Sequence, residues 1–237
     1  MSESYISHTG GEKKITDQIY LLARKFALKK KRKLVLSKSN GKSILDFGCG
    51  TGEFLNEMRS NEWSISGIEL SDLARAKAEQ LNQKKIYPNL SEIGNEKFDV
   101  ITLWHVLEHL HDLNDTLDKL KKLMKDTSTL IIAVPNHESH DAIHYQSFWA
   151  GYDVPRHLWH FSKKSMDELL KKNGFKLTEV LPMKLDSFYV SLLSEKYKYP
   201  KKSTITRLFS AFITGLVSNL KAKKSTNFSS LIYIAKS

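Results

Sequence analysis

Apolar and polar positions alternate along this chain with two different periods. Short apolar runs with the spacing of buried strands recur between residues 43 and 181, and longer segments with helical periodicity separate them. This alternation predicts an α/β fold built on a doubly wound parallel sheet. We expect strands at Ser43–Phe47, Ser64–Glu69, Asp99–Trp104, Leu130–Pro135 and Phe175–Leu181, a short one near Lys85–Tyr87 and a closing one at Ser230–Ala235.

The same patterns divide a single expected domain into four segments. Residues 1–36 form an N-terminal helical segment, 43–181 the core sheet, 182–227 an insertion and 228–236 the last strand. The insertion is far longer than a hairpin, and it begins at the carboxyl edge of the sheet, where ligands of such folds bind. We therefore expect it to fold as a helical cap over a substrate.

One helix of this cap is strongly amphipathic, and three interpretations of it stay open. Lysines flank it at both ends, and its polar face consists mostly of Ser, Thr, Ala and Gly. It can be a lid on the sheet, a homodimer interface or a membrane-surface helix. The small polar face favours burial of the helix against protein on both sides. We therefore prefer the lid to the dimer interface, and the dimer interface to the membrane-surface helix. The apolar face carries Ile205, Leu208, Phe209, Phe212, Ile213, Leu216, Val217 and Leu220.

Composition narrows the class of protein. Hydrophobic residues make up 41% of the 237 positions, as in a globular domain, and the single cysteine, Cys49, excludes an internal disulfide. We find neither a signal peptide nor an apolar run of membrane-spanning length, so we expect a cytoplasmic protein. The net charge of +11 suits nucleic acid, an anionic lipid surface or an acidic small substrate. The densest run, Lys29–Lys33, is explained equally well as a solvated helix end.

The stretch from Ile44 to Gly52 carries the first candidate chemistry. Three glycines at alternate positions follow an apolar strand and precede a helix, as where a backbone bends close to a ligand. Asp46 lies two residues before them and Glu69 ends the next strand. A carboxylate is unfavourable beside a pyrophosphate but favourable beside an ammonium group. Because Glu69 can chelate two ribose hydroxyls, the pattern indicates an S-adenosylmethionine (SAM) site.

At these residues the chain resembles the class I SAM-dependent methyltransferases. Residues 98–110 are similar to that family's fourth strand and following helix, and Val134–Asn136 to the end of its fifth strand. The run Asp153–Ser162 recurs in a subgroup similar to the small-molecule O-methyltransferases of quinone biosynthesis. The resemblance spans residues 43–181 and the last strand. It implies a Rossmann-like sheet of about seven strands, whose last strand runs antiparallel between the fifth and sixth.

The resemblance also implies a set of cofactor-binding residues. Thr102 to His105 would line the methionine part of SAM, and an N-terminal helix would close over the cofactor. Asn89 is a weak stand-in for the aspartate that many members place beside the adenine. The implied set is Asp46, Gly48, Cys49, Gly50, Gly52, Glu69, Leu70, Asn89, Leu103, Trp104, His105 and Arg24.

Residues 105–109 match H-x-x-E-H, a zinc-protease pattern. The motif directly follows a buried strand of a SAM-type sheet, where the resembled family carries similar residues. We therefore expect no metal. His109 either faces the substrate or is a structural histidine.

Methyl transfer requires a positioned acceptor and a group that takes its proton. His157 is the first choice for the base, His109 the second, and Arg156 can clamp an anionic group. Tyr152, Trp149 and His160 can form the acceptor pocket. The alternative is that these residues only hold their loop in place.

The sequence thus predicts a SAM-dependent methyltransferase acting on a small or lipid-like acceptor, at oxygen. An RNA methyltransferase is the rival that the basic charge supports. Against it, the chain lacks an Asn/Asp-Pro-Pro-Tyr/Phe motif, a catalytic cysteine pair and a separate RNA-binding domain. A non-catalytic SAM-binding protein is the third class, and the polar loop at residues 137–161 argues against it.

Overall fold

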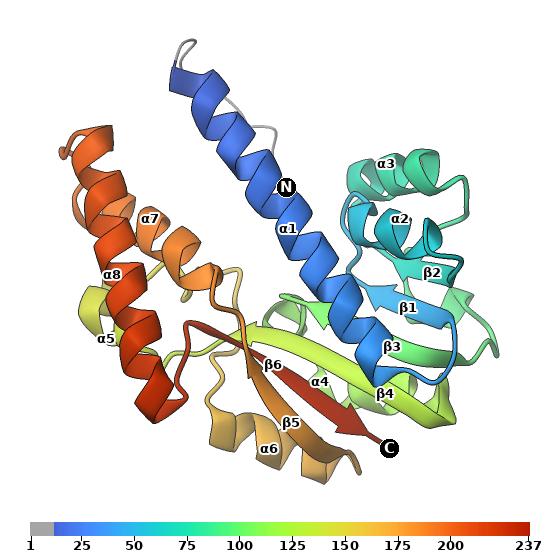
Figure 1. Cartoon of the computed structure of the whole chain (residues 1–237). Coiled ribbons are helices and arrows are strands. Elements are labelled where there is room, and N and C mark those ends of the chain that lie inside the picture. The colour runs from blue at the N-terminus through green and yellow to red at the C-terminus, as the bar shows by residue number, and fades with distance from the viewer. Residues whose placement is uncertain (1–11) are drawn as a thin grey trace. The chain divides into compact units, whose positions relative to one another are not determined.

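A computed structural model describes residues 12–237 of the chain, and the side chains from Arg24 onward (Figure 1). Six strands form one mixed sheet in the order β2-β1-β3-β4-β6-β5. They are β1 (Ser43–Phe47), β2 (Ser64–Ile68), β3 (Phe98–Trp104), β4 (Met124–Pro135), β5 (Lys176–Pro182) and β6 (Ser230–Lys236). The helices are α1 (Glu12–Lys38), α2 (Glu53–Arg59), α3 (Asp72–Asn82), α4 (Leu113–Lys122), α5 (His140–Tyr145), α6 (Lys163–Lys172), α7 (Asp186–Lys198) and α8 (Thr204–Ser225). The predicted α/β class with a Rossmann-like sheet is confirmed.

The chain divides into two compact units. The first comprises the residues up to Ile101 together with Leu123–Ser128. The second comprises Thr102–Lys122 and Thr129–Ser237. Two of the three boundaries fall inside strands, β3 and β4, and the third lies between α4 and β4, so each unit is built from separate stretches of sequence.

In the first unit, β1 and β2 are parallel and in register from Ser43↔Ser64 to Phe47↔Ile68. The apolar run of β1 is buried, as its sequence predicts. The short strand expected at residues 85–87 is a single parallel bridge between Ile68 and Tyr87. The sheet therefore has six strands where about seven were expected.

A polar cluster ties three distant stretches of the first unit together. Asp99 Oδ2 accepts hydrogen bonds from the Ser43 backbone N–H at 3.0 Å and from the Ser43 hydroxyl at 2.5 Å. Lys125 Nζ donates to the same oxygen at 2.9 Å. The Ser128 hydroxyl donates to the Phe98 carbonyl oxygen at 2.5 Å. These contacts extend β4 back to Met124, six residues before its expected start at Leu130, through a stretch too polar to show a strand period.

In the second unit, β6 lies between β4 and β5 and runs antiparallel to both. Leu130 pairs with Ala235 and Pro135 with Ser230 on one side, and Lys176 pairs with Lys236 on the other. The predicted antiparallel last strand is confirmed. Nearly all of β6 is buried, which explains why its sequence is a continuous apolar run.

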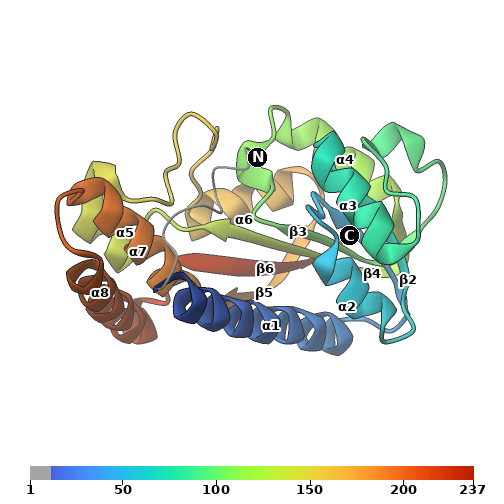
Figure 2. The ribbon, with the colours of Figure 1, turned by 90° about the horizontal axis from the view of Figure 1, so that it is seen from above.

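Helices α5, α7 and α8 form one group in the second unit (Figures 1 and 2). The face of α8 that packs inward is the small-residue face, with Ala211, Thr214, Gly215, Ser218 and Ala222 buried. A Cβ added at Gly215 of α8 would lie 2.7 Å from Cδ1 of Phe188 in α7, so α7 and α8 approach closely at this point. The larger apolar residues point outward: Phe209 is 68% exposed and Ile205 74%.

This arrangement reverses the expected packing of the cap helix. Two buried carboxylates, Asp141 and Glu195, explain the reversal. Ser218 Oγ donates to Asp141 Oδ1 at 2.6 Å, and Ser210 Oγ donates to Glu195 Oε1 at 2.7 Å. A buried carboxylate requires donors. Trp149 and Ser229 also donate to Asp141, and Tyr145 and Lys202 to Glu195, and the small polar face of α8 completes both sets. Among residues 12–237, no helix combines the length and apolarity required to span a membrane.

Candidate functional site

The glycine turn of the first unit has the backbone conformation that its sequence predicts. Gly48, Gly50 and Gly52 have φ of 75°, 56° and 77°, in the left-handed region that favours glycine. The Gly48 and Cys49 N–H groups both donate to the Ile68 carbonyl oxygen, at 2.8 and 2.9 Å. The turn is thus anchored to the end of β2.

Two of these glycines differ in what surrounds them. A Cβ on Gly52 would lie 2.9 Å from Ala78 Cα and 2.5 Å from Asn82 Nδ2, so α3 packs directly on that backbone. Asn82 Nδ2 also donates to the Gly52 carbonyl oxygen at 3.0 Å. A Cβ on Gly50 would meet nothing within 4 Å. Gly52 therefore serves packing, and Gly50 presents bare backbone to open space where a ligand can approach.

Glu69 holds the turn through both carboxylate oxygens. Oε2 accepts the Gly50 N–H at 2.8 Å and Oε1 accepts the Ser71 N–H at 2.9 Å. A carboxylate has about four lone-pair sites, so each oxygen keeps capacity for a ligand hydroxyl. Asp46, the other predicted carboxylate, is 3% exposed near the end of β1.

The electrostatic field at the turn is negative. Burial, reinforced by the charges of Asp46 and Glu69, raises the pKa of the Cys49 thiol well above its usual range. The thiol therefore stays protonated and is not a nucleophile. The same field favours a cationic ligand over a phosphate, which fits the ammonium and sulfonium groups of SAM.

The remaining cofactor residues predicted in this unit have varied surroundings. Leu70 is 83% exposed and so is available to cover a ligand. Asn89 accepts the Ser91 N–H at 3.0 Å and caps its own 3-10 turn. Arg24 Nε lies 2.7 Å from Glu53 Oε2 at the start of α2. Their contacts with a cofactor stay predictions.

In the second unit, β3 ends in the buried residues Leu103 and Trp104 and leads into His105, whose φ is 57°. His105 Nδ1 lies 3.3 Å from Glu108 Oε1, and its Nε2 lies 3.0 Å from Asp186 Oδ2. Burial alone would lower the pKa of His105, but the hydrogen bonds to Asp186 and Glu108 outweigh it and raise the pKa to about 10. His105 is therefore an imidazolium at neutral pH.

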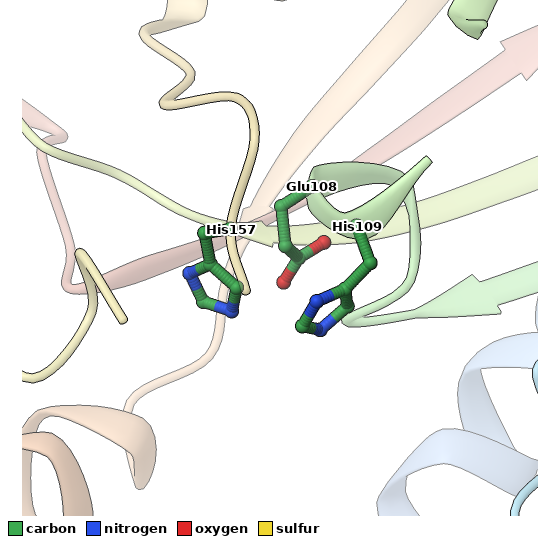
Figure 3. A group of neighbouring side chains, drawn as sticks. All are labelled: Glu108, His109 and His157. Atoms are coloured by element: carbon green, nitrogen blue, oxygen red, sulfur yellow. The ribbon is translucent and has the colours of Figure 1, made fainter. Parts of the chain in front are cut away.

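Glu108, His109 and His157 come together although α4, β4 and part of the following loop lie between the last residue and the other two in the sequence (Figure 3). The rings of His109 and His157 are 4.6 Å apart in an edge-to-face contact. His109 Nδ1 lies 3.0 Å from the Arg156 carbonyl oxygen, and His157 Nδ1 lies 2.9 Å from that of Gly151. Burial lowers the pKa of His157. Both predicted base candidates thus share one site.

The loop that carries His157 is fixed at several points. A bridge between Asn136 and Phe161 closes its base. The Leu158 N–H donates to the Glu108 carbonyl oxygen at 2.8 Å. Arg156 is 65% exposed in its side chain and pairs with Asp153 at 2.5 Å. Both alternatives for Arg156, loop anchor and anion clamp, are compatible with this position.

Of the three residues predicted for an acceptor pocket, Tyr152 lies between the other two. Tyr152 makes edge-to-face contacts with Trp149 at 5.1 Å and with His160 at 5.0 Å between ring centroids. Trp149 is 2% exposed, and its Nε1 donates to Asp141 Oδ2 at 2.8 Å. Its contacts favour the alternative in which it holds the loop in place. Tyr152 and His160 lie closer to the surface.

Asp186 was missed by the sequence reasoning, and Glu108 was noted only within a motif. Asp186 begins α7, 81 residues after the histidine that it contacts, so no local pattern connects the two. Glu108 offered one signal: an acidic residue that follows the apolar pair Val106-Leu107 shortly after a buried strand. The cap therefore reaches the site through Asp186, at its first helical residue.

Comparison with known proteins agrees with this geometry. A family model described as a methyltransferase domain matches residues 20–180. A ubiquinone biosynthesis O-methyltransferase of Actinobacillus pleuropneumoniae is 31% identical over 109 residues, covering 40% of this chain and 47% of that protein. The matched region spans about half the length of such relatives.

Two solved structures show the same fold. A SAM-dependent methyltransferase from Archaeoglobus fulgidus superposes with a TM-score of 0.59 at 19% identity, covering 90% of this chain and 94% of that one. A magnesium protoporphyrin IX methyltransferase from Synechocystis with bound S-adenosylhomocysteine (SAH) also gives 0.59, at 13% identity, covering 98% and 89%.

Proposed function

Because the chain belongs to the methyltransferase domain family, we propose that it transfers the methyl group of SAM to an oxygen atom of a small-molecule or lipid-like acceptor. SAM, when bound, supplies an electrophilic methyl group on a sulfonium. One observation carries the proposal: the glycine turn presents bare backbone at Gly50 beside two carboxylates, Asp46 and Glu69, and Glu69 accepts the Gly50 N–H. The relatives named as ubiquinone biosynthesis O-methyltransferases support oxygen as the acceptor atom.

The first unit supplies the cofactor contacts of this proposal. Asp46 attracts the ammonium group, the backbone of Gly48, Cys49, Gly50 and Gly52 lines the cofactor, and Glu69 binds the ribose hydroxyls. Leu70 and Asn89 flank the adenine, and Arg24 binds the carboxylate. Leu103, Trp104 and His105 are assigned to the methionine part.

The second unit supplies the acceptor chemistry. The Gly151 carbonyl can only accept a hydrogen bond, so it fixes the proton of His157 on Nδ1. Nε2 then carries a lone pair and can take the proton of an acceptor hydroxyl. His109 has the same arrangement through the Arg156 carbonyl and is the second candidate. Arg156 binds an anionic group of the acceptor, Tyr152 and His160 line the acceptor pocket, and the buried Trp149 supports Tyr152 from behind.

Binding of SAM tests the first half. We expect the wild-type protein to bind SAM and SAH in calorimetric titration, and Glu69→Ala to weaken both at least tenfold, because the turn and the ribose lose their acceptor. Glu62→Ala is the matched control, since that side chain is 87% exposed and pairs only with Lys42 among the contacts of the described chain. If the protein binds NAD but neither SAM nor SAH, the proposal is wrong.

Turnover tests the second half. The protein is incubated with methyl-labelled SAM and a panel of phenols, catechols, amines and carboxylic acids, and SAH and labelled products are measured. Transfer to an oxygen acceptor, with His157→Ala losing most of it while SAM affinity stays within a few-fold, is the expected result. Labelling of amines alone would move the assignment to nitrogen.

A homodimer through the cap helix and a cytoplasmic location stay predictions. The exposed apolar face of α8 supports the first, because contiguous apolar surface of this kind marks association sites.

A further inference from the structure

Glu108, His109 and His157 offer three ligand atoms that all lie within 4.8 Å of one another (Figure 3). Among the described side chains, those of residues 24–237, this is the only group of three or more His, Cys, Asp or Glu residues gathered so closely. Glu108 and His109 come from the 3-10 turn after β3, and His157 comes from the loop after β4. In the view of Figure 3, the carboxylate of Glu108 lies between the two rings.

The carboxylate of Glu108 is incompletely satisfied. The residue is 0% exposed, and its Oε1 is occupied by His105 at 3.3 Å. Its Oε2 has no hydrogen-bond partner. A buried, unpaired carboxylate oxygen is costly, and such groups in folded proteins are normally paired or coordinate a metal. The same carboxylate supplies one of the three ligand atoms of the cluster.

Both histidines are oriented as metal-binding histidines are. The backbone carbonyls of Arg156 and Gly151 accept from the two Nδ1 atoms at 3.0 and 2.9 Å, so in each neutral ring the lone pair lies on Nε2. His157 Nε2 also lies 3.8 Å from Asp153 Oδ2. A histidine that binds a metal through one ring nitrogen usually donates the N–H of the other nitrogen to a carbonyl or carboxylate, because this hydrogen bond fixes the tautomer and the ring plane.

The ligand set differs from the one that the H-x-x-E-H pattern suggests. That pattern pairs His105 with His109, but His105 is held between Glu108 and Asp186 at 3.3 and 3.0 Å. His157, 48 positions further along, takes its place. His105 is then a positioning residue for Glu108.

We propose that Glu108, His109 and His157 bind a divalent transition-metal cation, of which Zn²⁺ and Mn²⁺ are the best candidates. Two imidazoles and one carboxylate form an open ligand set that these ions accept, with the remaining positions left for water or an acceptor oxygen. The exposed side chain of His109 gives the cation access from solvent. The expectation of no metal, drawn from the sequence, is thereby revised.

The cation has a defined role in the proposed methyl transfer, and this part rests on that function. An acceptor hydroxyl bound to the cation loses its proton to solvent near neutral pH, as metal-bound water does. The acceptor oxygen then forms its bond to the methyl carbon as the carbon–sulfur bond breaks and the sulfonium becomes a neutral thioether. The cation thus replaces His157 as the group that makes the acceptor nucleophilic. Binding of the cation itself does not depend on the transfer.

Cobalt titration of the chelator-treated full chain tests the site. Co²⁺ bound to nitrogen and oxygen ligands has visible absorption bands that report its coordination, and Zn²⁺ displaces it. We expect one Co²⁺ per chain, and affinity lowered at least tenfold in His109→Ala, His157→Ala and Glu108→Gln. His144→Ala is the matched control, because this exposed histidine belongs to the same loop but not to the cluster.

Folding is controlled independently of the metal. His109 is exposed, so His109→Ala is expected to fold even where Glu108→Gln does not, and calorimetric SAM binding reports the state of the first unit. Absence of stoichiometric Co²⁺ binding in the wild type, or equal binding in wild type, His109→Ala and His157→Ala, would overturn the site.

Transfer assays separate the cation from the proposed function. Activity that falls on chelation and returns with Zn²⁺ or Mn²⁺ supports the role of the cation. Activity unchanged by chelation overturns that role and leaves His157 as base. Stoichiometric Co²⁺ binding by a protein that neither binds SAM nor transfers methyl groups would support the site while refuting the methyltransferase.

Discussion

Gly50 and Gly52 have the same left-handed backbone but different surroundings, and alanine substitutions separate the two effects. Gly52→Ala must displace the backbone of α3 at Ala78 in addition to adopting a strained φ, so we expect a loss of about 2–4 kcal/mol in unfolding free energy. Gly50→Ala meets only open space and should cost about 1 kcal/mol.

Urea denaturation measures the unfolding free energy of each variant. Titration with SAM measures whether the added methyl group at residue 50 weakens SAM binding. Gly50→Ala should weaken SAM binding while keeping the fold, because the added carbon occupies the space proposed for the ligand. Equal stability losses in the two variants would contradict the packing role of Gly52. Unchanged SAM affinity in Gly50→Ala would contradict the position assigned to the ligand.

Asp99 makes stability depend on pH in a defined direction. Partial burial opposes ionisation, but the hydrogen bonds from Ser43 and Lys125 outweigh it and lower the pKa of Asp99 below its ordinary value of 3.8. A carboxyl whose pKa is lower in the folded state stabilises the fold at higher pH, and this contribution is lost as the pH falls through the folded-state pKa.

Asp99→Asn should therefore lower the unfolding free energy at pH 7 by about 1.5–3 kcal/mol, the range for hydrogen bonds to a charged group. The difference from wild type should shrink below about pH 4. Urea denaturation at several pH values measures it, and the exposed neighbour Asp126 supplies the control, Asp126→Asn. A difference that is constant with pH would exclude ionisation of Asp99 as its cause.

At the scale of elements, the two faces of α8 should respond oppositely to substitution. Ser218→Val removes a donor from the buried Asp141 and should cost about 2–3 kcal/mol. Phe209→Lys changes a side chain that is 68% exposed and should alter stability by less than about 0.5 kcal/mol. If the homodimer forms through this face, Phe209→Lys should also raise its dissociation constant.

Thermal unfolding and sedimentation at several protein concentrations test both statements. A large stability loss in Phe209→Lys would show that this face is packed against protein within one chain. A dimer that withstands Phe209→Lys forms elsewhere. A monomeric wild type would leave the face to a lid or a lipid surface, and binding to anionic vesicles then separates those two.

The sequence predicted the elements of the sheet well and the packing of the cap poorly, for one physical reason. Residues of β1, β3 and β6 are buried by neighbours that the alternating pattern implies, so apolar runs identified them directly. The inward face of α8 is determined by Asp141 and Glu195, far away in the chain. The periodicity of apolar residues in a helix shows which face is hydrophobic. It does not show which carboxylate from elsewhere in the chain will pack against the polar face.

The same reason limits what could be predicted of the site. The glycine turn is local, so its spacing revealed it. The triad of Glu108, His109 and His157 forms only because the loop after β4 returns to the turn after β3. The sequence singled out both histidines as separate candidates for the base, but no local pattern showed that they lie together.

At the scale of the whole molecule, the net charge of +11 makes association with RNA a prediction that salt can test. Binding driven by Lys and Arg releases counterions, so affinity for a structured RNA should fall at least tenfold between about 50 and 200 mM salt. Filter binding over this range measures the fall, and labelled SAM should transfer no methyl group to the RNA. Salt-resistant binding with methyl incorporation would favour the RNA methyltransferase.

The division of the chain inside β3 and β4 has a consequence for how the molecule can be made and cut. The first unit needs Leu123–Ser128, because Leu123 and Ser128 hold Phe98 and Lys125 holds Asp99. On the ribosome, the unit that carries the glycine turn therefore cannot be completed until the chain has been synthesised past the first helix of the other unit. A chain truncated after Lys122 should therefore form an incomplete sheet and should not fold as a smaller SAM-binding protein.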